Sequence, residues 1–94
     1  MSKPIKAVKL IGGEIVMGWY SEKKGTFGGK KIVLEEAQEL IVDIVDGRME
    51  VQLAPWLPFA ETYTFEIELS SVVTVFNVRP NLVTNYKVAT GNKK

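Results

Sequence analysis

The sequence predicts a mainly β protein: a small, strongly bent, five-stranded barrel with a short C-terminal helix. Three observations lead to this fold class. Apolar and polar residues alternate with a period of two rather than 3.6. Glycine-containing tight turns separate the alternating runs. The 94 residues are enough for one core but too few for an immunoglobulin-type sandwich. We therefore expect a single domain over residues 1–94, with 91–94 frayed.

The clearest predicted element is a hairpin in the middle of the chain. Asp46-Gly47 separates the run Leu40 to Val45 from the run Arg48 to Leu53. A two-residue Asp-Gly turn favours a hairpin because both of its residues adopt positive φ. Alternate apolar positions in the second run predict that one of its faces is buried: Met49, Val51 and Leu53.

The N-terminal half predicts two further strands and a loop. Ile5 to Leu10 and Glu14 to Ser21 have strand character, and Gly12-Gly13 makes the turn between them. Glu22 to Lys30 carries three glycines and three lysines, which predicts a loop. The segment from Lys31 to Leu40 fits either a strand or a short helical turn.

The second half of the chain predicts two more strands. Thr62 to Leu69 alternates regularly and is expected to bury one face. Upstream, Pro55 and Pro58 bracket Trp56 and interrupt strand structure. We expect Trp56 to anchor a crossing loop, with a ligand platform or a partner-docking site as the alternatives.

The last predicted strand, Val72 to Val78, is apolar on both faces and needs a second cover. One candidate cover is the C-terminal segment Pro80 to Ala89, which has Leu82 and Tyr86 at helical spacing. The other is a second subunit that pairs along the strand edge, which closes into a ring if the rotation permits. In that case the interface residues are Val72, Val73, Val75, Phe76 and Val78.

The composition excludes much catalytic chemistry. The chain contains neither cysteine nor histidine, so thiol nucleophiles, Cys-ligated metals and Ser-His-Asp triads are excluded. We expect no enzyme and no cofactor. No apolar run is long enough for a signal peptide or a membrane span, so we expect a cytoplasmic protein without membrane contact.

A basic segment is the candidate binding site. Lys23, Lys24, Lys30 and Lys31 surround Phe27 in a glycine-rich stretch. Lysines neutralise phosphates, and a phenylalanine ring stacks on an unpaired base. This combination indicates single-stranded RNA or DNA as the ligand, and a flexible solubilising loop is the alternative interpretation.

The pattern Val8-x-Leu10-x-x-Gly13-x-x-Val16-x-Gly18-x-Tyr20 resembles the first half of the Sm1 motif of Sm/LSm proteins. In that family the motif spans the first two strands of a strongly bent, SH3-type barrel. The turn Leu69-Ser70-Ser71 resembles the one between the last two Sm strands, with Ser70-Ser71 in place of the family's Arg-Gly. Ser70 and Ser71 thereby join the candidate site. Lys24 stands where the family's Asp would be, and Phe27-Gly28 replaces its Met-Asn pair, so uridine-specific recognition is not expected.

Over nearly its full length the chain also resembles small Sm-like proteins of marine bacteriophages, cyanophages in particular. The shared features are Leu10-x-Gly12-Gly13-Glu14, the mid-chain hairpin, the Trp56 segment from Pro55 to Pro58, the run from Ser70 to Val75 and the Leu82/Tyr86 segment. The resemblance implies a homo-oligomeric ring of roughly five to seven subunits that binds nucleic acid during infection of the host cell. A structural or protein-interaction module of a phage is the alternative.

Overall fold

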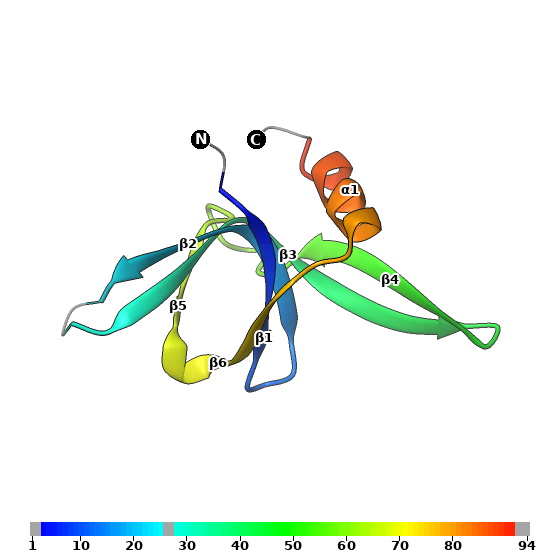
Figure 1. Cartoon of the computed structure of the whole chain (residues 1–94). Helices are drawn as coiled ribbons and strands as arrows, with labels where there is room; N and C mark the ends of the chain where they lie inside the picture. The colour runs from blue at the N-terminus through cyan, green and yellow to red at the C-terminus, as the bar shows by residue number, and fades with distance from the viewer. Residues whose placement is uncertain (1–2, 26–27, 92–94) are drawn as a thin grey trace.

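The computed structural model describes residues 3–25 and 28–91. Within them, six strands are followed by one α-helix (Figure 1). In chain order the elements are β1 (Ile5–Leu10), β2 (Ile15–Lys24), β3 (Lys30–Val45), β4 (Arg48–Pro55), β5 (Phe65–Glu68), the 3-10 turn η1 (Leu69–Ser71), β6 (Val72–Asn77) and α1 (Pro80–Ala89). The mainly β class and the C-terminal helix are thus confirmed, with one strand more than the five expected. No helix of the described residues is long and apolar enough to cross a membrane.

Every strand pair in the sheet is antiparallel, and β3 is its centre. The strand order is β4-β3-β2-β1-β6. One edge of β3 pairs with β2, and the other edge pairs first with β5 and then with β4. The turn η1 joins β5 to β6, but no ladder pairs these two strands in the described part of the chain, so the sheet stays open there.

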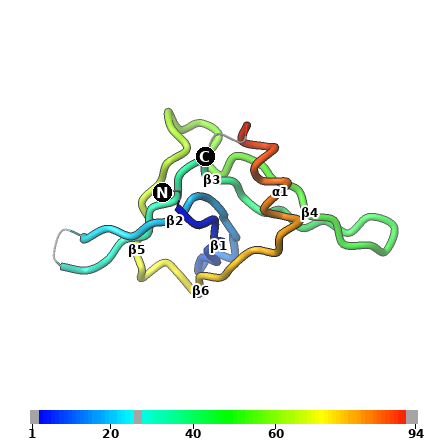
Figure 2. The backbone as a smooth tube through the Cα atoms, turned by 45° about the horizontal axis from the view of Figure 1, so that its top comes forward, coloured from blue at the N-terminus to red at the C-terminus, as the bar shows by residue number. Residues whose placement is uncertain are grey.

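The core consists of two clusters on opposite faces of the curved sheet. Neighbouring residues of β1 show the division, because Val8 belongs to the first cluster and Ala7 to the second. The first cluster fills the hollow of the bend and comprises Val8, Leu10, Val16, Ile32, Leu34, Ala37 and Ile67. The second lies under α1 and comprises Ala7, Met17, Trp19 and Tyr86. The curved strands and the covering helix are visible from a second direction in Figure 2.

Two irregularities bend the long strands. In β2 the register shifts between Met17 and Trp19, and a Cβ on the intervening Gly18 would lie 2.7 Å from the carbonyl oxygen of Glu35. In β3, Glu36 has a φ of 56°. Before Glu36 the even-numbered Ile32 and Leu34 face the first cluster, whereas after it the odd-numbered Ala37 does so. The irregularity therefore exchanges the two faces of β3.

The predicted loop from Glu22 to Lys30 is shorter than expected. β2 continues through Lys24 and β3 begins at Lys30, with Gly25 donating to the carbonyl oxygen of Gly29. The prediction was wrong because many glycines and lysines usually indicate a loop, whereas here the lysines are exposed residues at the ends of two paired strands. The uncertain segment from Lys31 to Leu40 is a strand, since β2 flanks one of its edges and β5 and β4 the other.

The Asp-Gly hairpin forms as predicted, with φ values of 53° at Asp46 and 76° at Gly47. It projects away from the core as the β3–β4 arm (Figure 1). The expected burial of its second strand is wrong for two residues, because Met49 is 72% and Val51 37% exposed. Only Leu53, at the base, packs against the second cluster. The arm extends beyond the elements that could cover it.

The segment between β4 and β5 crosses one end of the sheet. Trp56 packs edge-on against Phe65, with ring centroids 5.3 Å apart, and both rings lie against the first cluster. Trp56 thus anchors the crossing segment, as expected. The strand predicted over Thr62 to Leu69 is shorter, because Tyr63 precedes it and Leu69 begins η1.

β6 differs from the expected pattern because it contains a bulge. Val72 pairs with Leu10 and Thr74 with Lys9, which leaves Val73 as the extra residue. Val72 and Val75 therefore both face the first cluster, although regular alternation from Val72 to Val78 would put them on opposite faces. Three of the five predicted interface residues pack within the chain, namely Val72, Val75 and Val78. Val73 and Phe76 are exposed, at 59% and 38%.

Candidate nucleic-acid interface

The structure brings the four candidate lysines together at the end of the β2–β3 hairpin. Lys23 lies opposite Lys31, and Lys24 lies opposite Lys30. In each pair the two ammonium groups repel each other, because like charges directly opposite in an antiparallel ladder are unfavourable. Nearby acids or a bound anion would relieve that repulsion.

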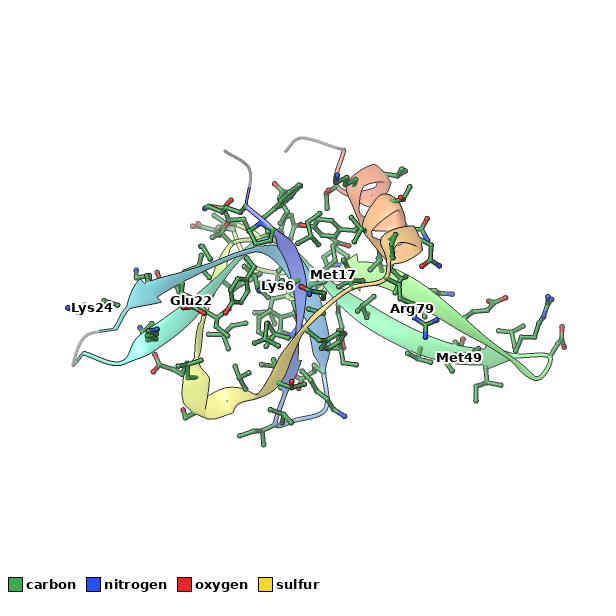
Figure 3. All side chains as sticks on the ribbon, in the orientation of Figure 1. Lys6, Met17, Glu22, Lys24, Met49 and Arg79 are labelled. Atoms are coloured by element: carbon green, nitrogen blue, oxygen red, sulfur yellow. The ribbon has the colours of Figure 1, made fainter. Side chains whose placement is uncertain are left out.

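The two lysine pairs lie on different faces of the hairpin, because neighbouring residues in a strand point to opposite sides. Lys24 and Lys30 share the face of the first core cluster with Tyr20 and Glu22, whereas Lys23 and Lys31 are on the outer face. Figure 3 shows Lys24 near the far end of the hairpin, with Glu22 closer to the core.

On the outer face, acids from β5 bind both lysines. The Lys23 ammonium is 2.7 Å from the Glu66 carboxylate. The Lys31 ammonium is 3.2 Å from Glu68 and 3.7 Å from Glu66. The hydrogen bond from Lys23 lowers the pKa of Glu66, and the bond to Glu68 raises the pKa of Lys31. These four charges compensate each other and leave the outer face close to neutral.

On the inner face, acidic side chains neutralise less of the positive charge of the lysines. The Lys30 ammonium is 3.9 Å from the Glu22 carboxylate, and Lys24 makes no ion pair with any residue of 3–25 or 28–91. Glu22 also accepts a 2.6 Å hydrogen bond from the Tyr20 hydroxyl. Together Glu22, Lys23, Lys24 and Lys30 line an open hollow of about 230 Å³.

Tyr20 connects this end of the hairpin to the core. Its ring packs against the first cluster, and the Lys6 ammonium lies 5.0 Å from the ring centroid. Partial burial, followed by the hydrogen bond to Glu22, raises the pKa of Tyr20 to about 12. The phenol is therefore neutral at physiological pH and acts as a hydrogen-bond donor.

The remaining candidate residues have different positions. Ser70 and Ser71 are exposed residues of η1, the turn that follows the Glu68 to which Lys31 binds. The Ser71 carbonyl oxygen accepts a hydrogen bond from the Ile11 amide. Phe27 lies outside the described residues.

Comparison with known proteins assigns no family to this arrangement: no protein-family model matches the chain, and a search of the curated proteins gives no match. The site is therefore interpreted from its own chemistry.

Sequence reasoning missed the two acids of β5 that bind the lysines. The alternation of Thr62 to Leu69 does place Glu66 and Glu68 on a polar face. The pairing of Lys31 with Glu68 across β3 and β5 depends on long-range register, which local alternation does not encode. The resulting site has a compensated outer face and a cationic inner face.

Proposed function

We propose that this chain is a non-enzymatic, Sm-like subunit of a homo-oligomeric ring that binds single-stranded RNA or DNA through the inner face of its β2–β3 hairpin. The observation that carries the proposal is the cross-strand pair Lys24–Lys30, which has only a 3.9 Å contact to Glu22 as compensation within the described residues. Phosphates along a strand supply the missing negative charge.

The open edges of the sheet support the ring. Among residues 3–25 and 28–91, β6 pairs with β1 along one edge and β5 with β3 along one edge, and no described strand pairs with their second edges. Unpaired strand edges are templates for pairing with another chain. A neighbour's β6 beside β5 would satisfy both edges, and Val73 and Phe76 would gain a cover.

The bent first half of the sheet supports the Sm-like assignment. Two glycines of the motif-like stretch lie where the backbone turns or bends: Gly13 has a φ of 100° in the β1–β2 turn, and Gly18 lies at the register shift of β2. The 3-10 turn between β5 and β6 is short, as the resemblance to the family leads us to expect of that connection. Closure of the barrel and membership of the phage family belong to the proposal.

Charge reversal on the inner face tests the binding site. Fluorescence polarisation of a labelled, mixed-sequence single-stranded oligonucleotide, as RNA and as DNA, should report binding at about 50 mM salt that weakens steeply as salt is added. We expect Lys24→Glu combined with Lys30→Glu to weaken binding at least about tenfold, because two phosphate contacts become repulsive in each subunit.

The control makes a single charge reversal, half of the change in the test variant, at a lysine outside the hairpin. Lys9 is an exposed residue of β1, away from the hairpin, and Lys9→Glu should change affinity only slightly. Absence of wild-type binding at low salt would refute the nucleic-acid function. Binding that tolerates the double reversal would refute the assignment to this face.

A second candidate is a structural or protein-interaction module of a phage. The observation that favours it is the exposed apolar surface of the β3–β4 arm, together with acids around three of the four lysines. This function predicts stable self-association without any salt-sensitive oligonucleotide binding, so the same polarisation assay separates the two.

A further inference from the structure

The β3–β4 arm, defined as residues 41–52, has one face made only of apolar side chains. Val42 lies opposite Val51, and Ile44 lies opposite Met49. Their exposed fractions are 53%, 37%, 74% and 72% in that order. We call these four residues the apolar arm face. A patch of adjacent exposed apolar side chains marks a docking surface.

All charges of the arm lie elsewhere. Asp43 and Glu50 are paired with each other on the opposite face, where Arg48 also lies, and Asp46 is in the turn at the tip. The apolar arm face can therefore meet an identical face without bringing like charges together. A charged residue on this face would have opposed that contact.

The apolar arm face continues the second core cluster outwards. At the base of the arm, Leu40 lies opposite Leu53, and both pack against the cluster that Tyr86 of α1 covers. The helix has ten residues, about 15 Å, and its cover ends before the apolar arm face does. A two-stranded ladder without further packing is only marginally stable in water. The outer half of the arm thus lacks the second layer that its base has.

A groove lies where the arm and α1 diverge. It has a volume of about 340 Å³, and it is lined by Met49, Val51, Arg79, Asn81, Leu82 and Asn85. Met49, Val51 and Leu82 are its apolar lining residues. Its polar lining residues are the guanidinium of Arg79 and the side-chain amides of Asn81 and Asn85. Arg79 makes no ion pair with any residue in the described ranges. Figure 3 labels two of these residues, Met49 on the arm and Arg79 between β6 and α1.

The tip of the arm itself has the chemistry that fits such a groove. It presents the apolar Ile44 two residues before Asp46, the acid of the turn. From Leu40 to the turn the arm extends about 20 Å, since each strand residue adds about 3.4 Å. Two arms that lie antiparallel, face to face, would bring the tip of each to the groove of the other.

We propose that a second copy of this chain covers the apolar arm face in a two-fold symmetric contact. The two arms pack face to face, and Asp46 of each copy reaches the Arg79 rim of the other. Such an isologous contact uses the same surface twice, so every favourable pair occurs two times. It is independent of the β5 and β6 edges invoked for the ring, and in a ring it would join two rings through their arms.

The size of the surface sets the expected strength. Four side chains and one groove are smaller than the roughly 800 Å² per partner of a standard interface. We therefore expect a contact with a dissociation constant on the order of micromolar for an isolated pair of chains. Repetition around a ring would strengthen it through effective concentration.

Polar substitutions that preserve strand propensity test the contact. In Val42→Thr combined with Ile44→Thr, the apolar arm face loses two of its four members while β-branching is retained. Multi-angle light scattering and sedimentation velocity should show the wild type with twice the mass of this variant, and the association constant should fall at least about tenfold. Circular dichroism checks that the variant stays folded.

The matched control makes the same change on the opposite face. Ile41 and Val45 are each 40% exposed there, and Ile41→Thr with Val45→Thr should leave the mass unchanged. The variant Asp46→Asn, which keeps a favourable hairpin turn, should weaken the association less than the threonine pair does. Added salt should then have a smaller effect than in the wild type.

The outcomes separate this contact from the proposed ring and its nucleic-acid binding. Equal masses for the wild type and the Val42/Ile44 variant would overturn the arm contact, and oligonucleotide binding by either protein would leave the proposed function standing. A wild type that is monomeric at several hundred micromolar would overturn both the arm contact and the ring. Halved mass with undiminished oligonucleotide binding would support both proposals.

Discussion

The hydroxyl of Tyr86 donates to the carbonyl oxygen of Glu36 at 2.7 Å, with the carbonyl oxygen of Glu35 at 3.1 Å. This bond joins α1 to β3 at the residue whose φ is 56°. Tyr86 is fully buried, and its ring packs edge-on against Trp19, with centroids 6.2 Å apart. This hydrogen bond thus holds helix α1 against β3 at Glu36, the residue after which the side chains of β3 alternate in the opposite sense.

Removal of this hydroxyl should destabilise the fold. We expect Tyr86→Phe to lower the free energy of unfolding by about 1–3 kcal/mol, because a buried carbonyl group loses its partner. Urea denaturation followed by tryptophan fluorescence measures the change. Tyr63→Phe is the control, since Tyr63 is 40% exposed, and equal losses in the two variants would contradict the role of the bond.

The close approach at Gly18 predicts a second destabilised variant. The added methyl of Gly18→Ala would lie 2.7 Å from the Glu35 carbonyl oxygen, a backbone atom that moves only with β3. We expect a loss of about 1–3 kcal/mol in the free energy of unfolding. Gly29→Ala serves as the comparison, because an added methyl there would meet no atom of the described residues within 4 Å beyond its chain neighbours. A tolerated alanine at Gly18 would mean that β2 and β3 can separate there without cost.

Tyr20 predicts a loss of stability in alkali. Its pKa is raised from 10.0 to about 12 in the folded chain, so the unfolded chain releases this proton first as pH rises. The contribution is fully present below pH 10 and is lost as the pH rises toward 12. Thermal melts should show a steeper decline over this window for the wild type than for Tyr20→Phe. Identical declines would show that burial and Glu22 do not hold the proton.

The ion pair between Lys23 and Glu66 predicts a change in carboxylate titration. Its hydrogen bond lowers the pKa of Glu66, so Lys23→Met should raise that pKa toward 4.5. Side-chain carboxyl shifts in an NMR pH titration report it directly. Lys24→Met should leave the Glu66 titration in place, because Lys24 lies on the other face of the hairpin. The effect on stability is expected to be small, since both partners are exposed.

The sequence contained most of the local structure and little of the long-range pairing. Alternation located β1 and β6, and Asp46-Gly47 located the hairpin within a residue or two of its bounds. These signals depend on the preferences of single residues and their neighbours. The pairing of β3 with both β5 and β4 on one edge depends on contacts between distant segments.

The β3–β4 arm also shows what local sequence patterns do not predict. Alternation predicts that Met49, Val51 and Leu53 share an apolar face, which the ladder confirms, but not what covers that face. Of these three, Leu53 packs against the cluster that Tyr86 of α1 covers, whereas Met49 and Val51 stay exposed. At the candidate site, the four lysines were identified from composition, whereas their division between two faces required the register.

The reversal of faces at Glu36 constrains how this chain can change length. Side chains of β3 after Glu36 alternate between the two faces of the sheet. One amino acid inserted between Glu36 and Leu40 would therefore move every apolar side chain of the β3 half of the arm to the opposite face. Two inserted together would restore the parity. Length variants of this hairpin should therefore differ by even numbers of residues in each strand, while the Asp46–Gly47 turn is carried along unchanged.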